Sequence, residues 1–541
     1  MSLTRRQLLV STVAASMTGI AAGQVPAADA LADTDDPSDP GLPSTLDLET
    51  ATVAQLKELL DAGRVSSERL TRAYIHRIEA LSAQPPSLNA VRALNRQALA
   101  EARAADVARR KGLPHGPLLG IPVLVKDNID VAGMATTAGS VALAGSRPAA
   151  DAPLVAQLRR AGAVILGKAN LTEFANFLTA GMPSGYSSLG GQVLNPYDAS
   201  QTPSGSSSGP AVAAAVGLAP LTVGTETSGS ILSPSVANSD VGIKPTVGLI
   251  SRTGIVPIAA SQDTAGPITK TVADAAAELT VLTGMDPLDA ATALNPLVGH
   301  DFTRDLRTDA LQGARIGVVA SQVPPAGTDN RALWDAATAA LAAQGATLVP
   351  VTLDTTSSIP GGSSVLTYEF KRDLNTYLSR LPGGAPMRTL ADIIAFNDAH
   401  APVALKFGQT QALASQAKDL GPGSADTAKY LADRAQDLVD SKGRIDAVMA
   451  ANGLTALLFA NAGSAAIGAR AGYPSITIPA GYQAGNRRPF NVTLLGPAWS
   501  EPTLIGYGFA LEQATMRRQP PSAINPTLFA TAGEEGRAQA S

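Results

Sequence analysis

The sequence of 541 residues contains no cysteine and only four histidines. Without cysteine there is no disulfide, no thiol nucleophile, no thiolate metal site and no lipoprotein anchor. The histidines are isolated along the chain, and none has a metal-binding spacing such as His-Glu-x-x-His; they are His76, His115, His300 and His400. We therefore expect no metal site, and any catalysis has to come from oxygen or amine groups.

Charged side chains are scarce, at 16% of the residues against about 25% in an ordinary globular protein. Apolar residues make up 45%, so the composition favours a thick, well-buried core. The net charge is -4, and Lys and Arg are scattered along the chain. Because this leaves no basic stripe to neutralise phosphates, we expect no nucleic-acid partner.

Outside the N-terminal segment the sequence has no long hydrophobic run. No window there reaches the ~18 consecutive apolar residues of a membrane span. Residues 1–30 combine the paired arginines of Thr4-Arg5-Arg6-Gln7-Leu8-Leu9, an apolar stretch to Ala22 and a small-residue cleavage site at Ala28-Asp29-Ala30. This pattern is typical of a twin-arginine signal peptide. We predict a secreted or extracytoplasmic protein that starts near Leu31 and has no stable membrane association after signal removal.

The rest of the chain reads as one long domain between two polar ends. We interpret residues 31–44 as an acidic, proline-rich linker, 45–530 as the domain and 531–541 as a flexible tail. Runs rich in Val, Ile and Leu alternate with helical patterns, which predicts an α/β fold around a mixed, mainly buried sheet. Residues about 365–450 have a mostly helical pattern and predict a helical insertion or cap over the site. The predicted strands cover 121–125, 163–166, 315–319, 347–353, 456–459, 475–478 and 490–495, and the predicted helices 52–63, 67–81, 93–110, 152–161, 209–217, 271–283 and 330–343.

Two familiar catalytic patterns occur in the sequence, and we set both aside. Residues 162–168 begin like a phosphate-binding P-loop, but Ala169 stands where a hydroxyl must bind magnesium, and the segment reads as a strand that carries Lys168. Residues 205–209 match Gly-x-Ser-x-Gly, which would make Ser207 the nucleophile of an α/β-hydrolase. That motif has to follow a strand directly, whereas here it follows a polar, proline-containing loop.

Three other segments carry a different constellation. They are GIPVLVKDNID at 120–130, PSGSSSGPAVAAAVG at 203–217 and GTETSGSILSPSVANSDVGIKPT at 224–246. Together they resemble the amidase signature family, in which a lysine follows an apolar strand, a relay serine lies in a serine–glycine segment and a nucleophilic serine follows a Gly-Thr-Asp-type loop. The matching positions are Lys126, Ser206 and Ser230, and the two serines are 24 residues apart, as the family pattern requires.

The resemblance extends over nearly the whole domain, and YEFKRDLNTYL with RTLADIIAFN at 368–397 is most similar to bacterial peptide amidases. It implies the amidase signature fold, a large mixed twisted sheet covered by helices on both faces with a helical insertion. Four positions depart from the broader pattern without removing a catalytic side chain; they are Ser204, Ser208, Ser228 and Leu232.

The resemblance also implies a role for each matched residue. Ser230 is the expected nucleophile, Ser206 a proton relay that follows a cis peptide bond, and Lys126 the base. A lysine base has to be neutral, so we expect burial to lower its pKa from the usual value of ~10.4 by roughly three, which corresponds to about 4 kcal/mol. The expected oxyanion donors are the backbone N–H groups of Thr227, Ser228, Gly229 and Ser230. Two carboxylates in the same motifs, Glu226 and Asp263, are expected to brace the loop by hydrogen bonds rather than to react.

The implied reaction is the hydrolysis of carboxamides, above all C-terminal peptide amides, to acid plus ammonia through an acyl-enzyme. The implied partners are small-molecule or peptide amide substrates, with no metal and no organic cofactor. Three alternatives stay open: an aryl or acyl amidase, the glutaminase-type subunit of an amidotransferase and, outside the enzymes, a binding module on the same fold.

Overall fold

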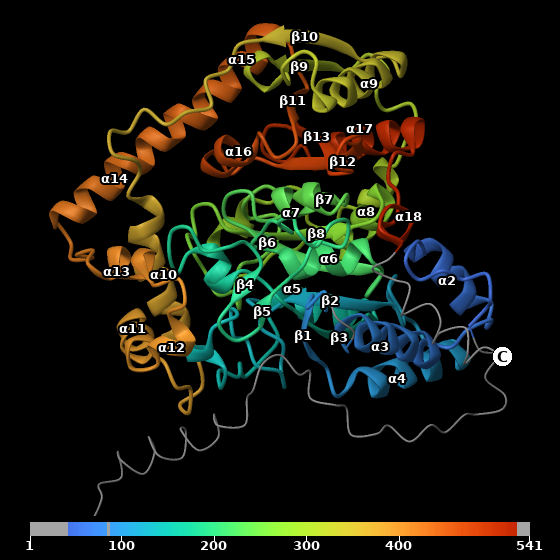
Figure 1. Ribbon diagram of the computed structural model, residues 1–541, viewed down its shortest axis with the longest axis horizontal. Coiled ribbons are helices and arrows are strands. Elements are labelled where there is room, and N and C mark those ends of the chain that lie inside the picture. The colour runs from blue at the N-terminus through green and yellow to red at the C-terminus, as the bar shows by residue number, and fades with distance from the viewer. Residues whose placement is uncertain (1–41, 84–86, 527–541) are drawn as a thin grey trace, which may run out of the picture.

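The computed structural model describes residues 42–83 and 87–526 (Figure 1). The predicted signal peptide at 1–30, most of the predicted linker at 31–44 and the predicted tail at 531–541 lie outside the described residues. These three assignments stay predictions.

A single 11-stranded sheet runs through the molecule and organises the rest of the fold (Figure 1). Its strand order is β1-β3-β2-β6-β8-β7-β12-β13-β11-β9-β10. β2 is parallel to β3 and β6, and β9 is parallel to β10 and β11, whereas the strands between these two groups pair antiparallel. The sheet is therefore mixed, as predicted. The strands are β1 (Val91–Leu94), β2 (Pro122–Lys126), β3 (Val164–Ala169), β6 (Leu221–Glu226), β7 (Val241–Lys244), β8 (Thr264–Thr269), β9 (Arg315–Val319), β10 (Thr347–Val351), β11 (Ala456–Ala460), β12 (Ser475–Tyr482) and β13 (Pro489–Leu495), with β4 (Tyr186–Ser187) and β5 (Gly191–Gln192) in a separate pair.

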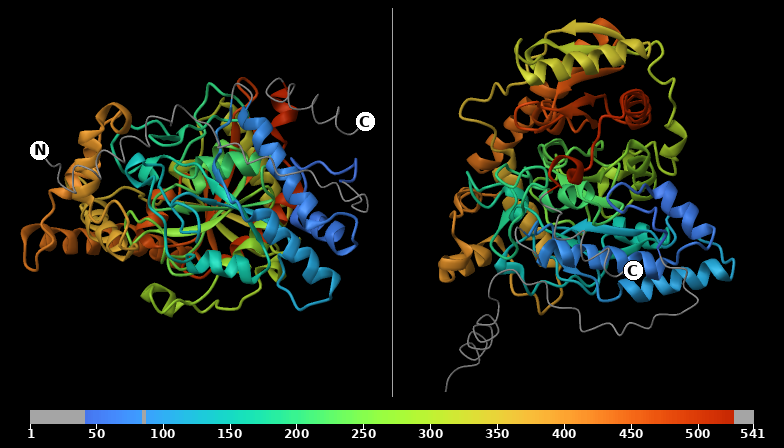
Figure 2. Two further views of the ribbon diagram at one scale, coloured as in Figure 1. Left: turned by 90° about the horizontal axis from the view of Figure 1, so that it is seen from below. Right: turned by 45° about the vertical axis from the view of Figure 1, so that its right-hand side comes forward.

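Helices cover both faces of this sheet (Figure 2). In one layer α5, α8, α17 and α9 contact one another in that order, while α6 and α7 pack against the central strands. The helices are α2 (Val53–Asp61), α3 (Ser67–Ala83), α4 (Ala98–Arg110), α5 (Pro153–Arg160), α6 (Ser208–Ala215), α7 (Leu232–Ala237), α8 (Val272–Leu282), α9 (Asp329–Ala343), α10 (Val365–Arg380), α11 (Leu390–Ala399), α12 (Ala401–Ala404), α13 (Thr410–Gln416), α14 (Ala425–Leu438), α15 (Arg444–Asn452), α16 (Ala465–Ala471), α17 (Glu501–Thr515) and α18 (Pro521–Ile524).

Local sequence signals account for many of these boundaries. α2 starts where expected, because the Thr52 side chain accepts from the Gln55 N–H and the Gln55 side chain accepts from the Thr52 N–H in a complete capping box. All seven predicted strands are present, and each begins or ends within a few residues of its predicted limit. Four strands of the large sheet were not predicted, namely β1, β6, β7 and β8, and neither was the separate pair β4 and β5. β6 (LTVGTE) and β8 (TAGPIT) are fully buried but contain Thr, Gly and Pro, so they lack the apolar run by which the others were recognised.

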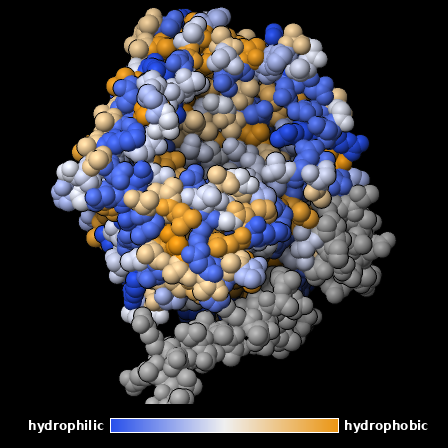
Figure 3. Space-filling view, turned by 60° about the vertical axis from the view of Figure 1, so that its left-hand side comes forward, coloured by the Kyte–Doolittle hydropathy of each residue, from blue (hydrophilic) through white to orange (hydrophobic). Residues whose placement is uncertain are grey.

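The segment from α10 to α15 is almost entirely helical and stands beside the sheet on the left of Figure 1. Its inner side has a hydrophobic cluster of its own, in which Phe370, Leu374 and Leu378 of α10 pack against Phe174 and Phe177. Figure 3 shows this side of the molecule, where patches of hydrophobic residues reach the surface. The exposed large hydrophobic side chains of the segment are Val403, Phe407, Leu413, Leu431 and Val439. Across the described ranges, none of the helices combines the length and the apolar character needed to cross a membrane.

Candidate active site

Lys126 is the last residue of β2, and its side chain is completely buried. Its Nζ lies 2.8 Å from Ser206 Oγ, 2.9 Å from Ser207 Oγ and 2.9 Å from Thr225 Oγ1. Ser207 cannot donate to the lysine, because its hydroxyl donates to the Thr225 carbonyl oxygen at 3.0 Å and accepts from the Thr225 N–H at 3.2 Å. Within the described chain, the Ser206 hydroxyl has Lys126 as its one hydrogen-bond partner. Ser206 is therefore the hydroxyl that remains able to pass a proton to the lysine.

Burial lowers the pKa of Lys126 to about 7, although the carboxylates of Glu226 and Asp263 oppose this by raising it. A pKa in this range leaves a large neutral fraction near neutral pH, which a lysine base requires. A low pKa alone does not single out Lys126, because burial also lowers the pKa of Lys244 and Lys270 to about 8. Of these three buried lysines, Lys126 is the one whose amine contacts serine hydroxyls.

The segment before α6 brings the two serines of the relay region to the nucleophile loop. The peptide bond between Gly205 and Ser206 is cis, as the resemblance implied. The N–H of Ser207 donates to the carbonyl oxygen of Ser230 at 3.1 Å. Ser206 and Ser207 are 0% exposed, whereas Ser230 is 8% exposed. Because a nucleophile has to reach the substrate, the burial of Ser207 and the loop that precedes it argue against the Gly-x-Ser-x-Gly interpretation.

The loop between β6 and α7 contains the expected oxyanion donors. Glu226, at the end of β6, accepts through one oxygen from the N–H of Ile231 at 2.8 Å and from that of Leu232 at 3.0 Å. This single carboxylate thus clamps both ends of the loop, as expected for a bracing residue. The N–H groups between these ends form no hydrogen bond to any residue that the structure describes; they belong to Thr227, Ser228, Gly229 and Ser230. Preorganised N–H groups that the protein does not use are suited to hold an oxyanion.

Asp263 braces the same loop from its other side. One of its oxygens accepts from the Thr227 hydroxyl at 2.5 Å, and the other accepts from the N–H groups of Ile258 and Ala259, each at 2.9 Å. Burial raises the pKa of Asp263 to about 7, while these hydrogen bonds act to lower it. Both carboxylates that the sequence singled out therefore serve as hydrogen-bond acceptors for the loop.

Other ionisable groups near β2 have structural partners. Lys168 lies on β3, which agrees with the prediction that residues 162–168 form a strand and not a P-loop. Its amine forms a buried ion pair of 3.2 Å with Asp127. It also donates to the carbonyl oxygen of Ile129 at 2.6 Å. Among the residues of 42–83 and 87–526, no three His, Asp or Glu side chains are grouped so that they could hold a metal.

Two polar residues near Lys126, Thr225 and Asn128, were not foreseen. The Thr225 hydroxyl accepts from Lys126 and also from Asn128 Nδ2 at 3.0 Å. Both residues lie inside the motifs quoted from the sequence: Thr225 directly precedes Glu226, and Asn128 lies two residues after Lys126. The residues were therefore visible in the sequence, but their contact follows only from the pairing of β2 with β6. Because β6 was not predicted, that contact could not be predicted either.

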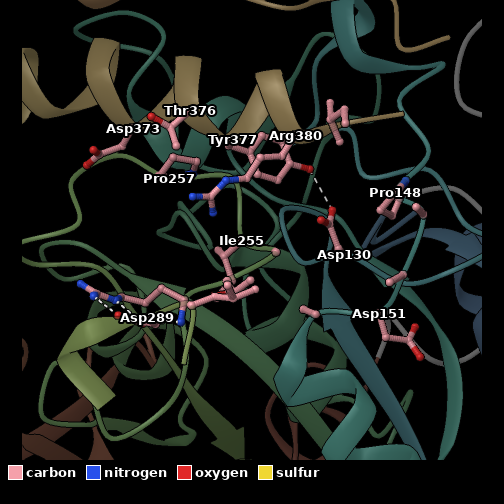
Figure 4. Close-up of a pocket in the computed structure, with 18 of the residues that line it drawn as sticks. Asp130, Pro148, Asp151, Ile255, Pro257, Asp289, Asp373, Thr376, Tyr377 and Arg380 are labelled. Atoms are coloured by element: carbon pink, nitrogen blue, oxygen red, sulfur yellow. Dashed lines mark hydrogen bonds and ion pairs between the residues drawn. The ribbon is translucent and has the colours of Figure 1, made fainter. Parts of the chain in front are cut away.

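A cavity of about 380 Å³ opens beside this region, between α10 and the loops around residues 148–152 and 252–257 (Figure 4). The Tyr377 hydroxyl of α10 donates to Asp130 at 2.8 Å across it. Burial raises the pKa of Asp130 to about 6, against the lowering effect of this bond. No local sequence pattern indicates this contact, because it joins residues 247 positions apart.

Comparison with known proteins agrees with this geometry. The family model described as Amidase matches residues 69–467. The native peptide amidase of Stenotrophomonas maltophilia is 43% identical, with a TM-score of 0.80, over 87% of this chain and 98% of that one. An amidase family protein of Bacillus anthracis is 37% identical, with a TM-score of 0.82, over 87% and 92% of the two chains. A probable amidase of Arabidopsis thaliana is 39% identical over 496 residues, 89% of this chain and 93% of the relative. Since the matched region contains the buried lysine, the serine pair and the braced loop, the chain belongs to the amidase family and is an amide-hydrolysing enzyme.

Proposed function

We propose that the enzyme hydrolyses C-terminal carboxamides of short peptides to the free acid and ammonia, through an acyl-enzyme on Ser230. The observation that carries the mechanism is the contact of 2.8 Å between the buried amine of Lys126 and the Ser206 hydroxyl. A buried amine with a pKa of about 7 accepts a proton at neutral pH, and it does so through a hydroxyl that has no other partner in the described chain.

Acylation begins with neutral Lys126. Ser230 attacks the amide carbon while its proton passes to Ser206, and the Ser206 proton passes to Lys126. The carbonyl π bond becomes an oxyanion, which the loop N–H groups stabilise; one such donor contributes about 3–4 kcal/mol. The lysinium then returns its proton through Ser206 to the leaving nitrogen, the C–N bond breaks and ammonia departs.

Deacylation uses the same groups in the same order. Water attacks the ester carbon while its proton passes through Ser206 to Lys126, and the proton then returns to Ser230 as its bond to the acyl carbon breaks. The cycle releases the acid and restores neutral Lys126. Each step is a proton transfer or an acyl transfer, so the proposed cycle contains no redox step.

The substrate proposal rests on the leaving group and on the relatives. A primary amide leaves as ammonia and needs little space beyond the scissile bond, whereas the peptide has to be held on the acyl side. The helical segment α10–α15 is available for that purpose as a wall beside the sheet. Similarity to a protein named peptide amidase supports the same substrate class.

Mass spectrometry of an N-blocked dipeptide amide tests this proposal. We expect the mass change of replacing NH2 by OH at the C-terminus, with internal peptide bonds intact. Internal fragments would instead indicate a peptidase. Turnover of anilides without peptide amides would indicate an aryl acylamidase, and turnover of glutamine alone a glutaminase.

We further propose export by the twin-arginine route, which the pattern of residues 1–30 supports. A fusion of these residues to a reporter that is active only after folded export tests it. Substitution of Arg5 and Arg6 by lysine should abolish reporter export. Unchanged export of that variant would refute the proposal.

A further inference from the structure

Two carboxylates of helix α10, Glu369 and Asp373, accept hydrogen bonds from the backbone of the loop at residues 258–263. The N–H of Ala260 donates to Asp373 Oδ2 at 2.9 Å, and the N–H of Ser261 donates to Glu369 Oε2 at 3.0 Å. Glu369 is 1% exposed. A hydrogen bond to a charged group is stronger than one between neutral groups, so these two bonds fix the loop backbone to the helix.

The same loop is tied at its other end to the expected oxyanion donors. The N–H groups of Ile258 and Ala259 donate to Asp263, whose second oxygen accepts from the Thr227 hydroxyl. Four successive backbone N–H groups, 258 to 261, are thus held by three carboxylates. A continuous series of hydrogen bonds therefore runs from α10, through this loop and Asp263, to Thr227.

The helix that begins this series is itself held firmly. Tyr430 of α14 donates to the second oxygen of Glu369 at 2.7 Å, and Arg372 pairs with Asp373 at 2.7 Å. Phe370, between the two carboxylates, packs edge-on against Phe177 with ring centroids 5.0 Å apart. The two acceptors consequently keep one position relative to the sheet.

We propose that Glu369 and Asp373 are positioning residues, through which the helical segment sets the geometry of the N–H groups at 227–230. This inference rests on the proposed function, because it assigns those groups to the oxyanion. In this role α10 contributes to stabilisation of the transition state, in addition to bordering the substrate site. An N–H group that shifts by about 1 Å can cost about a hundredfold in rate.

Kinetics with a blocked dipeptide amide test the inference. For Asp373→Ala and Glu369→Ala we expect kcat to fall about ten- to a hundredfold, with KM little changed. Asp373→Asn keeps an oxygen that can accept from the Ala260 N–H, so it should recover most of kcat. The matched control is Lys371→Met on the same helix. It removes two hydrogen bonds to the carbonyl oxygens of Gln416 and Lys418, does not touch the loop, and should leave kcat near the wild-type value.

Two binding measurements separate positioning from a general structural effect. A blocked dipeptide aldehyde forms a tetrahedral adduct that needs the oxyanion donors, so Asp373→Ala should weaken its inhibition by the same factor as kcat. The dipeptide amide itself, measured by calorimetry in the Ser230→Ala background, should bind equally well with and without Asp373→Ala. Thermal unfolding of each variant shows whether it is folded at the assay temperature.

The outcomes distinguish the two proposals. Wild-type kcat in both alanine variants, or a rise of KM alone, would overturn the positioning role while a dead Ser230→Ala variant still supports the proposed function. Full turnover by Ser230→Ala would overturn the proposed function itself. If an alanine variant does not fold, Asp373→Leu and Glu369→Met decide, because they keep a side chain of similar size but remove the acceptor: an equal loss of kcat and of aldehyde affinity supports the inference, and no loss of either, compared with Lys371→Met, counts against it.

Discussion

The backbone N–H of Ser207 donates to the carbonyl oxygen of Ser230 at 3.1 Å. This bond joins the relay segment to the nucleophile loop at the level of the main chain, so side-chain changes at either serine leave it in place. Alanine variants of these serines therefore test chemistry with little disturbance of the local backbone.

Ser230→Ala should abolish turnover of every amide while the thermal unfolding temperature stays near that of the wild type. The reason is that a loop hydroxyl of this kind carries chemistry and little packing. A fluorophosphonate should label the wild type at Ser230, as read by peptide mapping, and should not label the variant. Chelators should leave the rate unchanged, and a chelator-dependent loss would point to a metal.

Ser206→Ala and Ser207→Ala should differ strongly in kcat. Loss of a group that transfers protons costs about 10²–10⁴-fold, which we expect for Ser206. Ser207→Ala removes one of several acceptors around Lys126 and should retain far more activity. The reverse ranking would revive the Gly-x-Ser-x-Gly nucleophile.

The pH profile should show Lys126 acting in its neutral form. Since the pKa of Lys126 is about 7, kcat/KM should rise with pH through this value and then level off. Asp263 has a pKa in the same range, so a variant is needed to identify the group. Glu226 raises the pKa of Lys126, and Glu226→Gln keeps an acceptor for Ile231 and Leu232 without the charge. The midpoint of its profile should therefore move to lower pH, and a midpoint that stays fixed or rises would contradict the assignment.

Lys126→Met should be inactive yet more stable than the wild type at mildly acidic pH. The folded pKa of Lys126 is lowered from 10.5 to about 7, so between these values the unfolded state binds more protons. The penalty for burying this amine is therefore fully present below pH 7 and fades as pH rises toward 10.5. The difference in unfolding temperature between variant and wild type, measured from pH 6 to pH 10, should shrink with rising pH. A difference that grows with pH would contradict a neutral buried lysine.

The sequence predicted the fold class, seven of the sheet's strands and the segments of the site, because apolar runs and short motifs are local signals. It did not reveal β6 and β8, since the space around them excludes large side chains. A Cβ on Gly224 would lie 3.0 Å from Ser207 Oγ, and one on Gly266 would lie 2.1 Å from the Ile243 carbonyl oxygen. Small residues are required there, and these same residues hide the strand pattern.

The hydrogen bonds from the loop at 258–261 to Glu369 and Asp373 could not be predicted from the sequence either. They join residues 108 and 113 positions apart, and a carboxylate on a helix surface is usually only solvated. The bracing role expected for Glu226 and Asp263 agrees with the structure, and most of the N–H groups that these carboxylates hold lie within six residues of them, at 231–232 and 258–259.

The continuous sheet has a consequence for how this protein can be divided. Strands from residues 91–269 and strands from residues 315–495 meet where β7 pairs with β12, through Lys244 with Ser475, Ile243 with Ile476 and Gly242 with Thr477. A fragment ending near residue 300 would retain the relay, the base and the nucleophile loop, yet its β7 would become an open edge with unpaired N–H and C=O groups. Such a fragment would be expected to associate edge to edge and precipitate, so the half of the chain that carries the site motifs depends on the other half for its solubility.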